Sequence, residues 1–130
     1  MAKNKILIID DDLDFIESTK VVLEAHDYEI FIATNKDDGL KEIAKCNPAL
    51  IILDVMMQRM SDGFDLARKL KTMDNYKNIP ILVLTAVGEK TGFKFSADAG
   101  DEAWLPVEDY CEKPIEPSVL LEKVSKLLNK

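Results

Sequence analysis

Acidic residues crowd the end of the first apolar run of the sequence. The segment ILIIDDDLDF (residues 6–15) places four aliphatic residues before Asp10, Asp11 and Asp12, and Asp14 follows one residue later. Carboxylates this close repel one another, so the cluster needs a compensating cation or hydrogen-bond donors. Mg²⁺ prefers oxygen ligands of this kind and usually takes one or two carboxylates together with a phosphate oxygen. The segment therefore indicates a site for a divalent cation.

Other groups with complementary chemistry stand at the ends of later apolar runs. They are Asp54 at the end of ALIILD, Thr85 and then Ala86 after PILVL, and Lys113 and then Pro114 after the weaker run EDYCE. An aspartate held at the end of a buried strand can act as a nucleophile toward a phosphoryl group. Mg²⁺, an ammonium, a hydroxyl and backbone N–H groups can neutralise the phosphoryl charge during such a transfer. We expect an aspartyl phosphate on Asp54, with Asp11 and Asp54 as direct Mg²⁺ ligands and Asp10 acting through water.

Several of these residues also have an ordinary structural interpretation. Aspartate is a good N-cap residue, so we expect Asp12 and Asp14 to start the first helix rather than to take part in chemistry. Thr85 alone would be a common strand residue, and Lys113 alone a solvated lysine. The chemical interpretation depends on the strand ends meeting at one place.

The hydrophobic pattern predicts the elements that would bring these residues together. Runs rich in Ile, Leu and Val predict buried strands at 5–10, 29–33, 49–54 and 80–85, with a weaker strand at 108–113. Between them, helical spacing relates Phe15, Ile16, Thr19, Val22 and Leu23; Leu40, Ile43 and Ala44; Leu66, Ala67, Leu70 and Met73; and Leu120, Leu121, Val124, Leu127 and Leu128. The alternation predicts a parallel sheet with helices on both faces, and ligands bind such sheets beyond the carboxyl ends of the strands.

Length and charge limit the class of protein. The 130 residues, 47% of them hydrophobic, are expected to form one domain over 1–130. The net charge of −7 opposes direct binding to nucleic acid. No apolar run approaches the roughly 20 residues that span a bilayer, so we expect a cytoplasmic protein without a membrane partner.

Cysteine and histidine are too few for several common kinds of site. Cys46 and Cys111 lack metal-ligand spacing, and His26 is the single histidine. This excludes a zinc site in practice and predicts two reduced thiols. We expect His26 to be a solvated residue at the end of a helix.

The motifs together resemble the receiver domain of two-component response regulators, similar to single-domain chemotaxis and sporulation members. The matching segments are ILIIDDD (6–12), LIILDVMM (50–57), DGF (62–64), ILVLTA (81–86) and YCEKPIEP (110–117), in the family's order over almost the whole chain. The resemblance implies a flavodoxin-like, doubly wound, five-stranded sheet in the order 2-1-3-4-5. It also implies a phosphoacceptor switch, with only self-catalysed phosphotransfer and dephosphorylation, rather than an enzyme.

The resemblance assigns a role to each matching residue. Asp54 corresponds to the phosphoacceptor, and the metal site consists of Asp10, Asp11, Asp54 and the carbonyl of Met56. The residues that would bind the phosphoryl group or switch are Thr85, Ala86, Tyr110, Lys113 and Pro114, with a cis bond between the last two. The implied partners are a sensor histidine kinase or phosphotransfer protein and a downstream effector of unknown identity. The phosphoryl state would change the surface around the fourth helix, the fifth strand and the fifth helix.

The sequence departs from the family pattern at two places. Gln58 stands where the family usually has proline, and Gly63 comes one position late, so we expect the loop after Asp54 to be one residue longer and less rigid, with an altered path between Gln58 and Ser61. The segment 88–109 is longer than usual and lacks a helical stripe, which predicts a short or irregular fourth helix. Its aromatic residues are expected to form a small satellite core or, alternatively, a partner site; they are Phe93, Phe95 and Trp104. The family's usual dimer cannot be assumed from this sequence.

Two other functions remain as alternatives. A haloacid-dehalogenase-type phosphohydrolase also uses an aspartate after its first strand, but Asp14 stands where that pattern needs threonine or valine, and Asp54 would have no role. An interaction module that keeps only the fold is the other alternative, since a fold alone does not prove a function.

Overall fold

Nine helices and strands make up the described part of the chain. The computed structural model describes residues 4–54, 60–85, 109–112 and 115–128. In chain order the elements are β1 (Lys5–Ile9), α1 (Leu13–Glu24), β2 (Glu29–Ala33), α2 (Lys36–Cys46), β3 (Leu50–Asp54), α3 (Met60–Lys71), β4 (Ile81–Thr85), β5 (Asp109–Glu112) and α6 (Pro117–Leu128). Each of the five predicted strands is present, and its bounds agree with the prediction to within one residue at each end.

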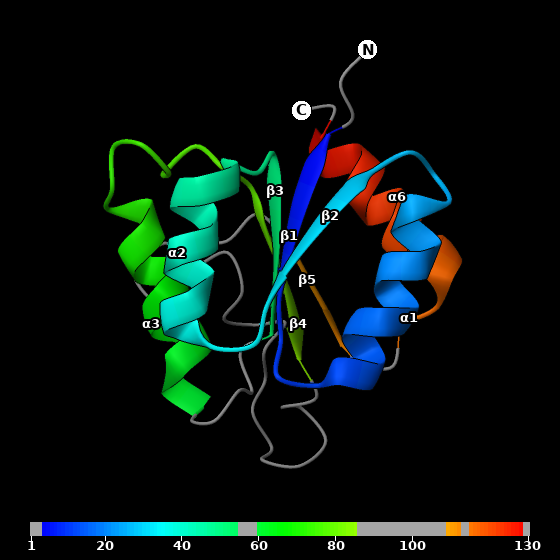
Figure 1. Cartoon of the computed structure of the whole chain (residues 1–130), viewed down its shortest axis with the longest axis horizontal. Helices are drawn as coiled ribbons and strands as arrows, with labels where there is room; N and C mark the ends of the chain where they lie inside the picture. Colours follow the sequence, from blue (N-terminus) through cyan, green and yellow to red (C-terminus); the bar gives the residue numbers. More distant parts are fainter. Residues whose placement is uncertain (1–3, 55–59, 86–108, 113–114, 129–130) are drawn as a thin grey trace.

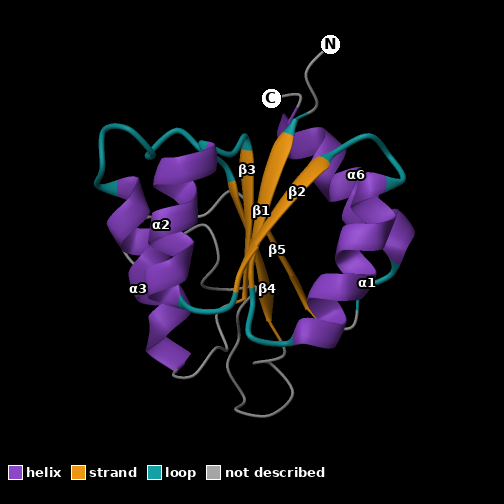
Figure 2. Cartoon of the chain, viewed as in Figure 1, coloured by secondary structure: helices purple, strands orange, loops and turns teal. Residues whose placement is uncertain are grey.

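The strands form one parallel sheet in the order β2-β1-β3-β4-β5. Figures 1 and 2 show the sheet edge-on, with α2 and α3 covering one face and α1 and α6 the other. This confirms the predicted doubly wound fold and strand order. The short or irregular fourth helix predicted within 88–109 lies outside the described residues.

Alternate side chains of the central strands fill two separate cores. On β1, Leu7 and Ile9 belong to the core under α2 and α3, whereas Ile6 and Ile8 belong to the core under α1 and α6. Every residue of β3 is buried. Apolar side chains on both faces explain why these strands appear in the sequence as continuous runs without polar alternation.

The helices turn most of their predicted apolar residues toward the sheet. Ile16, Thr19 and Leu23 of α1 are buried, as are the central residues of the stripes on α3 and α6. The predicted stripe on α2 is wrong at Ala44, which is exposed. Gly39, Ile43 and Cys46 form the buried face of α2 instead, because its close approach to the sheet occurs at the glycine.

Two predictions about connecting segments have different outcomes. The extra residue predicted in the loop after Asp54 stays a prediction, and α3 begins at residue 60. Residues 55–59 lie outside the description. His26 follows the C-cap residue of α1 and is exposed, with its Nδ1 atom 3.1 Å from the Val22 carbonyl oxygen, which confirms the prediction of a solvated helix-end histidine.

The two cysteines are buried on opposite faces of the sheet. Cys46 ends α2, and Cys111 belongs to the core beneath α1 and α6. No disulfide joins them, as predicted. Within the described ranges, no helix has both the length and the apolar character needed to cross a membrane.

Candidate functional site

The register of the sheet places two aspartates side by side at the carboxyl end of its central strands. Ile9 of β1 pairs with Leu53 of β3, so the residues that follow them, Asp10 and Asp54, leave the sheet at the same level. Asp54 in turn pairs with Leu84 of β4. The predicted convergence of these strand ends is therefore present in the structure.

Three carboxylates gather at this point. One ligand oxygen from each of Asp10, Asp11 and Asp54 lies within 4.8 Å of the other two. Asp10 and Asp54 are only 1% and 4% exposed, whereas Asp11 is open to solvent. Two aspartates of the group are thus held within the protein, and the third faces the side from which an ion would enter.

The cluster fits a small hard cation. Mg–O bonds of about 2.0–2.1 Å place the oxygens of one octahedron about 3–4 Å apart. The observed upper separation of 4.8 Å is slightly wider, which suits a site where one carboxylate acts through water or moves inward on binding. The all-oxygen donor set excludes the thiolate and imidazole chemistry of zinc sites at this cluster.

Hydrogen bonds to β2 and within the acidic loop itself orient Asp10 and Asp11. The Asp10 backbone N–H donates to the Ala33 carbonyl oxygen (3.0 Å), which ties the end of β1 to β2. The Asp10 Oδ1 atom accepts a hydrogen bond from the backbone N–H of Asp12 at 2.9 Å. This bond spans Asp11 and fixes the turn on which Asp11 is presented to solvent.

Asp12 and Asp14 have the structural roles that the sequence predicts. The Asp12 Oδ1 atom accepts hydrogen bonds from the N–H groups of Asp14 (3.1 Å) and Phe15 (3.2 Å), which makes Asp12 the N-cap of α1. Asp14 lies in the first turn, where a negative charge interacts favourably with the helix dipole. Neither residue belongs to the carboxylate cluster.

Of the remaining predicted site residues, the structure describes the backbone positions of two. Thr85 ends β4 and pairs with Glu112, the residue before Lys113, and Tyr110 pairs with Val83. The backbone of β5 thus ends beside Thr85, as the prediction requires. The other predicted members lie outside the described residues; they are Met56, Ala86, Lys113 and Pro114, with the cis bond between the last two.

The cysteines offer no competing chemistry within the described part of the chain. Burial, with a further contribution from the nearby Glu42 carboxylate, raises the pKa of the Cys46 thiol above its ordinary value of 9.0. A thiol in this state stays protonated near neutral pH and is a poor nucleophile.

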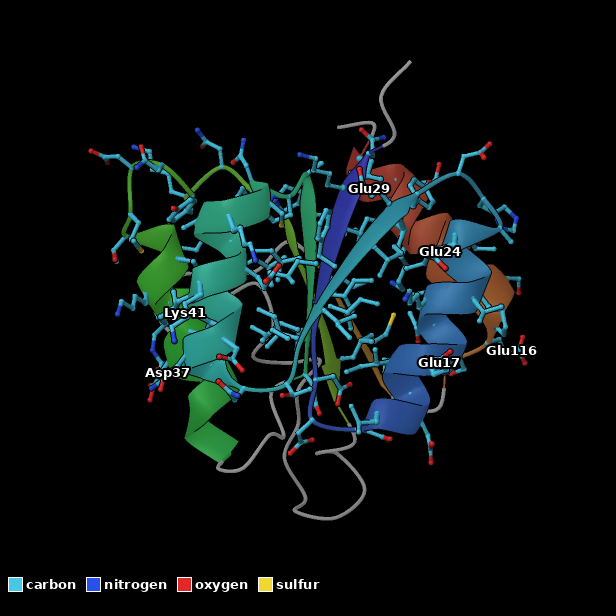
Figure 3. The ribbon with its side chains drawn as sticks, viewed as in Figure 1. Glu17, Glu24, Glu29, Asp37, Lys41 and Glu116 are labelled. Carbon is cyan, nitrogen blue, oxygen red and sulfur yellow. The ribbon has the colours of Figure 1, made fainter. Side chains whose placement is uncertain are left out.

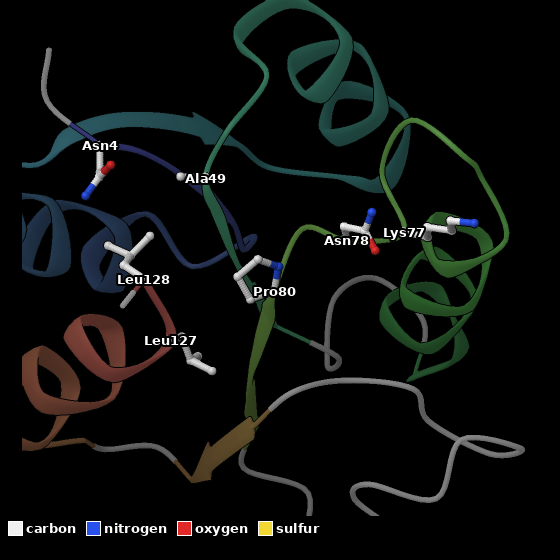
Figure 4. A pocket seen from close by; sticks show the side chains of 7 residues that line it. All are labelled: Asn4, Ala49, Lys77, Asn78, Pro80, Leu127 and Leu128. Atoms are coloured by element: carbon white, nitrogen blue, oxygen red, sulfur yellow. The ribbon is translucent and has the colours of Figure 1, made fainter. Parts of the chain in front are cut away.

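Among the hollows in the described part of the chain, two lie against α6, away from the carboxylate cluster. One, of about 350 Å³, is at the amino ends of the strands, between residues that precede β1, β3 and β4 and the end of α6 (Figure 4). The other, of about 200 Å³, is an apolar groove between α1 and α6, and its lining includes Phe15, Val22 and Ile115. The sequence prediction missed this groove. Its lining residues Phe15, Thr19, Val22 and Leu120 belong to the predicted core stripes, so the apolar pattern gave no separate signal for it.

Comparisons with protein families and with curated proteins point to the same kind of domain. A family model for the response regulator receiver domain matches residues 6–125. The transcriptional regulatory protein SrrA of Staphylococcus aureus is 35% identical over 131 aligned positions, which cover 98% of this chain and 48% of that protein. The chain thus spans about half the length of the curated relatives it matches.

Solved structures share the whole fold. A response regulator from Chloroflexus aurantiacus has a TM-score of 0.85 and 33% identity, covering 98% of this chain and 99% of that one. The receiver domain of a sensor histidine kinase from Pseudomonas aeruginosa, with a magnesium ion coordinated in its active site cleft, has a TM-score of 0.82 and 18% identity, covering 99% and 100%. At 18% identity the second likeness is one of fold alone.

Proposed function

The chain belongs to the response regulator receiver domain family, whose members accept a phosphoryl group on an aspartate in two-component signalling, and we propose that Asp54 is the acceptor in this chain. The observation that carries the proposal is the position of Asp54, buried at the end of β3 and within 4.8 Å of Asp10 and Asp11. Residues 1–130 would then act as one receiver unit.

The proposed chemistry is a direct transfer to the Asp54 carboxylate. A carboxylate oxygen attacks phosphorus in line with the donor, the new P–O bond forms, and the donor's bond to phosphorus breaks with its electron pair returning to the donor. With a phosphohistidine donor, the leaving imidazole then takes up a proton. The same pocket would position water for the slower hydrolysis of the aspartyl phosphate, so both reactions are self-catalysed.

Mg²⁺ is the proposed cofactor of this transfer. Asp11, Asp54 and the Met56 carbonyl would be its direct protein ligands, and Asp10 would act through water. When bound, the ion neutralises charge on the phosphoryl oxygens and offsets the repulsion among the three carboxylates. The magnesium in the cleft of the Pseudomonas receiver domain and the oxygen-only cluster of this chain both support the assignment.

The switch would consist of residues at the ends of β4 and β5. We propose that the Thr85 hydroxyl, the N–H of Ala86 and the Lys113 ammonium bind the phosphoryl oxygens, with Pro114 holding the turn after Lys113. Movement of Thr85 toward the phosphoryl group would open space for Tyr110. The surface around the fourth helix, β5 and α6 would then differ between the two states, which is what an effector reads.

The phosphodonor protein would dock on the apolar groove between α1 and α6. Receiver domains exchange signals with histidine kinases, and this groove is lined by Phe15 in the first turn of α1, the helix that begins at the exposed Leu13 directly after the acidic loop. An exposed carboxylate lies at its margin: Glu116, labelled in Figure 3, stands between the lining residues Ile115 and Pro117. An amphipathic helix with basic residues at its margin, from a sensor kinase or a phosphotransfer protein, would match it.

The output would pass to another protein or to a separate domain. The net charge of −7 gives this chain no electrostatic attraction to nucleic acid, although its relative SrrA is a transcriptional regulatory protein.

Incubation with MgCl₂ and acetyl phosphate tests the proposal directly. Intact mass spectrometry should show the addition of one phosphoryl group that is lost in hydroxylamine, as expected for an acyl phosphate. Asp54→Asn should abolish the modification, whereas the matched control Asp37→Asn, an exposed aspartate on α2, should leave it unchanged. Labelling that survives in Asp54→Asn would contradict the assignment. Steady hydrolysis of an organic phosphate ester would favour the phosphohydrolase alternative.

A further inference from the structure

β2 forms one edge of the sheet, and within the described ranges no further strand lies beyond it. It pairs with β1 alone, since the strand order begins with β2. In Figure 1, α1 and α2 flank it on the two faces of the sheet. Ile32, near the end of the strand, is a large apolar residue and is 43% exposed. Such an edge presents backbone donors and acceptors to which another strand can bind.

The ladder with β1 determines which backbone groups of β2 point outward. The Glu29 N–H donates to the Asn4 carbonyl oxygen at 2.9 Å, and Ala33 is likewise bonded to the residue that follows β1. Successive residues of a strand direct their hydrogen bonds to opposite sides, so every second residue of β2 bonds toward β1. The N–H and C=O groups of Ile30 and Ile32 therefore point away from the sheet.

This pattern is complementary to itself about Phe31, the central residue of β2. In an antiparallel pair, residues that exchange both N–H···O bonds alternate with residues that exchange none. A second β2 strand, turned by 180° about Phe31, would place its Ile32 opposite Ile30 and its Ile30 opposite Ile32. Each of these pairs would exchange both bonds. The two Phe31 side chains would meet between them, on the face of the sheet that α2 covers.

A hollow beside this edge carries a row of alternating charges. The hollow has a volume of about 300 Å³ and lies between the end of β2 and one flank of α2. Its charged lining residues, in order along the helix, are Asp38, Lys41, Glu42 and Lys45. Lys41 and Lys45 are exposed, and the Lys45 Nζ atom lies 3.9 Å from the Glu42 Oε1 atom. The row contains two acids and two bases and is open to a partner.

The same two-fold rotation makes this charged row complementary to itself. α2 packs on β2 and β1, so the α2 helices of two paired copies would run antiparallel to each other on one face of the joined sheet. Because the row is centred between Lys41 and Glu42, Lys41 would face Glu42 of the second copy. By the same symmetry, Asp38 would face Lys45. Complementary charges of this kind fix the register of an interface and disfavour wrong partners.

We propose that β2 is the surface through which two copies of this chain associate as a two-fold dimer. The occupant of the edge is the β2 strand of the second copy, in antiparallel orientation. One strand and the helix flanks beside it make a small interface, of the size that forms weak, transient complexes. β5 lies at the opposite edge of the sheet, so this dimer leaves the proposed switch surface uncovered.

Charge reversal on α2 tests the two-fold arrangement. Lys41→Glu would set acidic side chains against each other twice in each dimer, and Glu42→Lys would do the same with basic ones. Sedimentation equilibrium up to millimolar protein should show a dimer of the unsubstituted chain, weakened about tenfold or more in each single variant. Lys41→Glu/Glu42→Lys exchanges the two charges and should restore the affinity to within about threefold. A mixture of the two single variants should form the mixed dimer.

Lys126→Glu is the matched control. It changes the net charge as Lys41→Glu does, at an exposed lysine of α6 on the other face of the sheet. Its association should equal that of the unsubstituted chain. Equal weakening in this control, or failure of the double variant to restore the dimer, would overturn the proposal. A chain that stays monomeric at millimolar concentration would overturn it too, and the edge would then be left to a strand from another protein.

Amide hydrogen exchange locates the interface on the backbone. In dilute protein, the outward amides of Ile30 and Ile32 should exchange faster than the Phe31 amide, which bonds toward β1. At concentrations where the dimer forms, the two outward amides should become protected and Phe31 should change little. Ile32→Pro removes one outward N–H from each copy without breaking the ladder with β1, so it should abolish the dimer while circular dichroism shows a retained fold. A dimer in which both outward amides stay unprotected would overturn the proposal.

Discussion

Replacing Asp54 by asparagine should stabilise the metal-free protein and remove its stabilisation by Mg²⁺. The substitution keeps the size of the side chain and an oxygen acceptor but deletes one of three clustered charges. It removes two repulsive pairs, Asp54 with Asp10 and Asp54 with Asp11. The effect on the free energy of unfolding can be worked from the observed separations.

Coulomb's law gives the magnitude at 4.8 Å, the upper limit of the separation between the carboxylate oxygens. Two unit charges 4.8 Å apart repel by about 0.9 kcal/mol in water and about 3.5 kcal/mol at an effective dielectric constant of 20. The buried pair Asp10–Asp54 belongs toward the upper value, and the pair with exposed Asp11 toward the lower. Because Asp54 also has favourable interactions that asparagine reproduces only in part, we expect a net gain of about 1–3 kcal/mol without metal.

Mg²⁺ should reverse the order of stability. An ion that binds only the folded state stabilises it by about 2.7 kcal/mol at a concentration one hundred times its dissociation constant. The unsubstituted protein should show a gain of this size in saturating MgCl₂, whereas Asp54→Asn, with a ligand lost, should gain little. In the unsubstituted protein, Mg²⁺ thus offsets the same repulsion that the substitution removes.

Urea denaturation followed by circular dichroism measures both quantities, once with EDTA and once with MgCl₂. Asp37→Asn, an exposed aspartate outside the cluster, is the control and should not change the response to Mg²⁺. A loss of stability in Asp54→Asn without metal would refute the view that repulsion dominates the site. An equal gain from Mg²⁺ in both proteins would refute the assignment of the ion to this cluster.

Three further predictions concern the surroundings of the site. Asp12→Ala should lower the free energy of unfolding by about 1 kcal/mol through loss of the α1 cap, while Asp12→Asn, still a good cap, should not, as urea denaturation will show. Asp27→Gly should raise it by up to about 1 kcal/mol in the same assay, because Asp27 has a φ of 68° that glycine adopts without strain. Burial raises the pKa of the Cys46 thiol in the folded state above the unfolded pKa near 9.0. The contribution of the buried thiol to the free energy of unfolding is therefore complete below the unfolded pKa, and it is lost as the pH rises from there toward the folded-state pKa. Stability measured across this range should therefore fall less steeply in Cys46→Ala, and an equal fall in both proteins would contradict the raised pKa.

Much of the fold and the centre of the site could be predicted because the central strands β1, β3 and β4 are apolar on both faces and end at polar residues. Apolar runs such as ALIILD predicted the strands, and the polar residues at the ends of these runs predicted that Asp10, Asp11 and Asp54 lie close together. The N-cap of α1 and the solvated position of His26 were also predictable, since they depend on residues near in sequence, as with Asp12 and the amides after it.

Features that depend on how individual side chains and helices pack against distant parts of the chain were not predicted. The approach of Gly39 to Ile9 joins residues thirty positions apart, and nothing in the local pattern of α2 distinguishes a glycine that fits a neighbour from one that ends a helix. The prediction that Ala44 is buried was wrong for the same reason. The buried face of α2 is the one that carries Gly39, where the helix approaches the sheet. The groove between α1 and α6 needs the relative position of two helices at opposite ends of the chain.

The chemical residues themselves determine the register of the central strands. In a half-buried strand, the alternation of polar and apolar residues specifies the register, because a slip by one residue exchanges the two faces. β3 lacks this signal, since all of its residues are buried and a slip would mostly exchange one aliphatic side chain for another. Asp54 supplies the missing register signal. If β3 slipped by one residue and carried Asp54 into the sheet, the Asp54 carboxylate would lose access to a cation. The uncompensated buried charge would then destabilise the folded state by several kcal/mol. The same carboxylate that is expected to accept the phosphoryl group therefore also fixes where β3 ends.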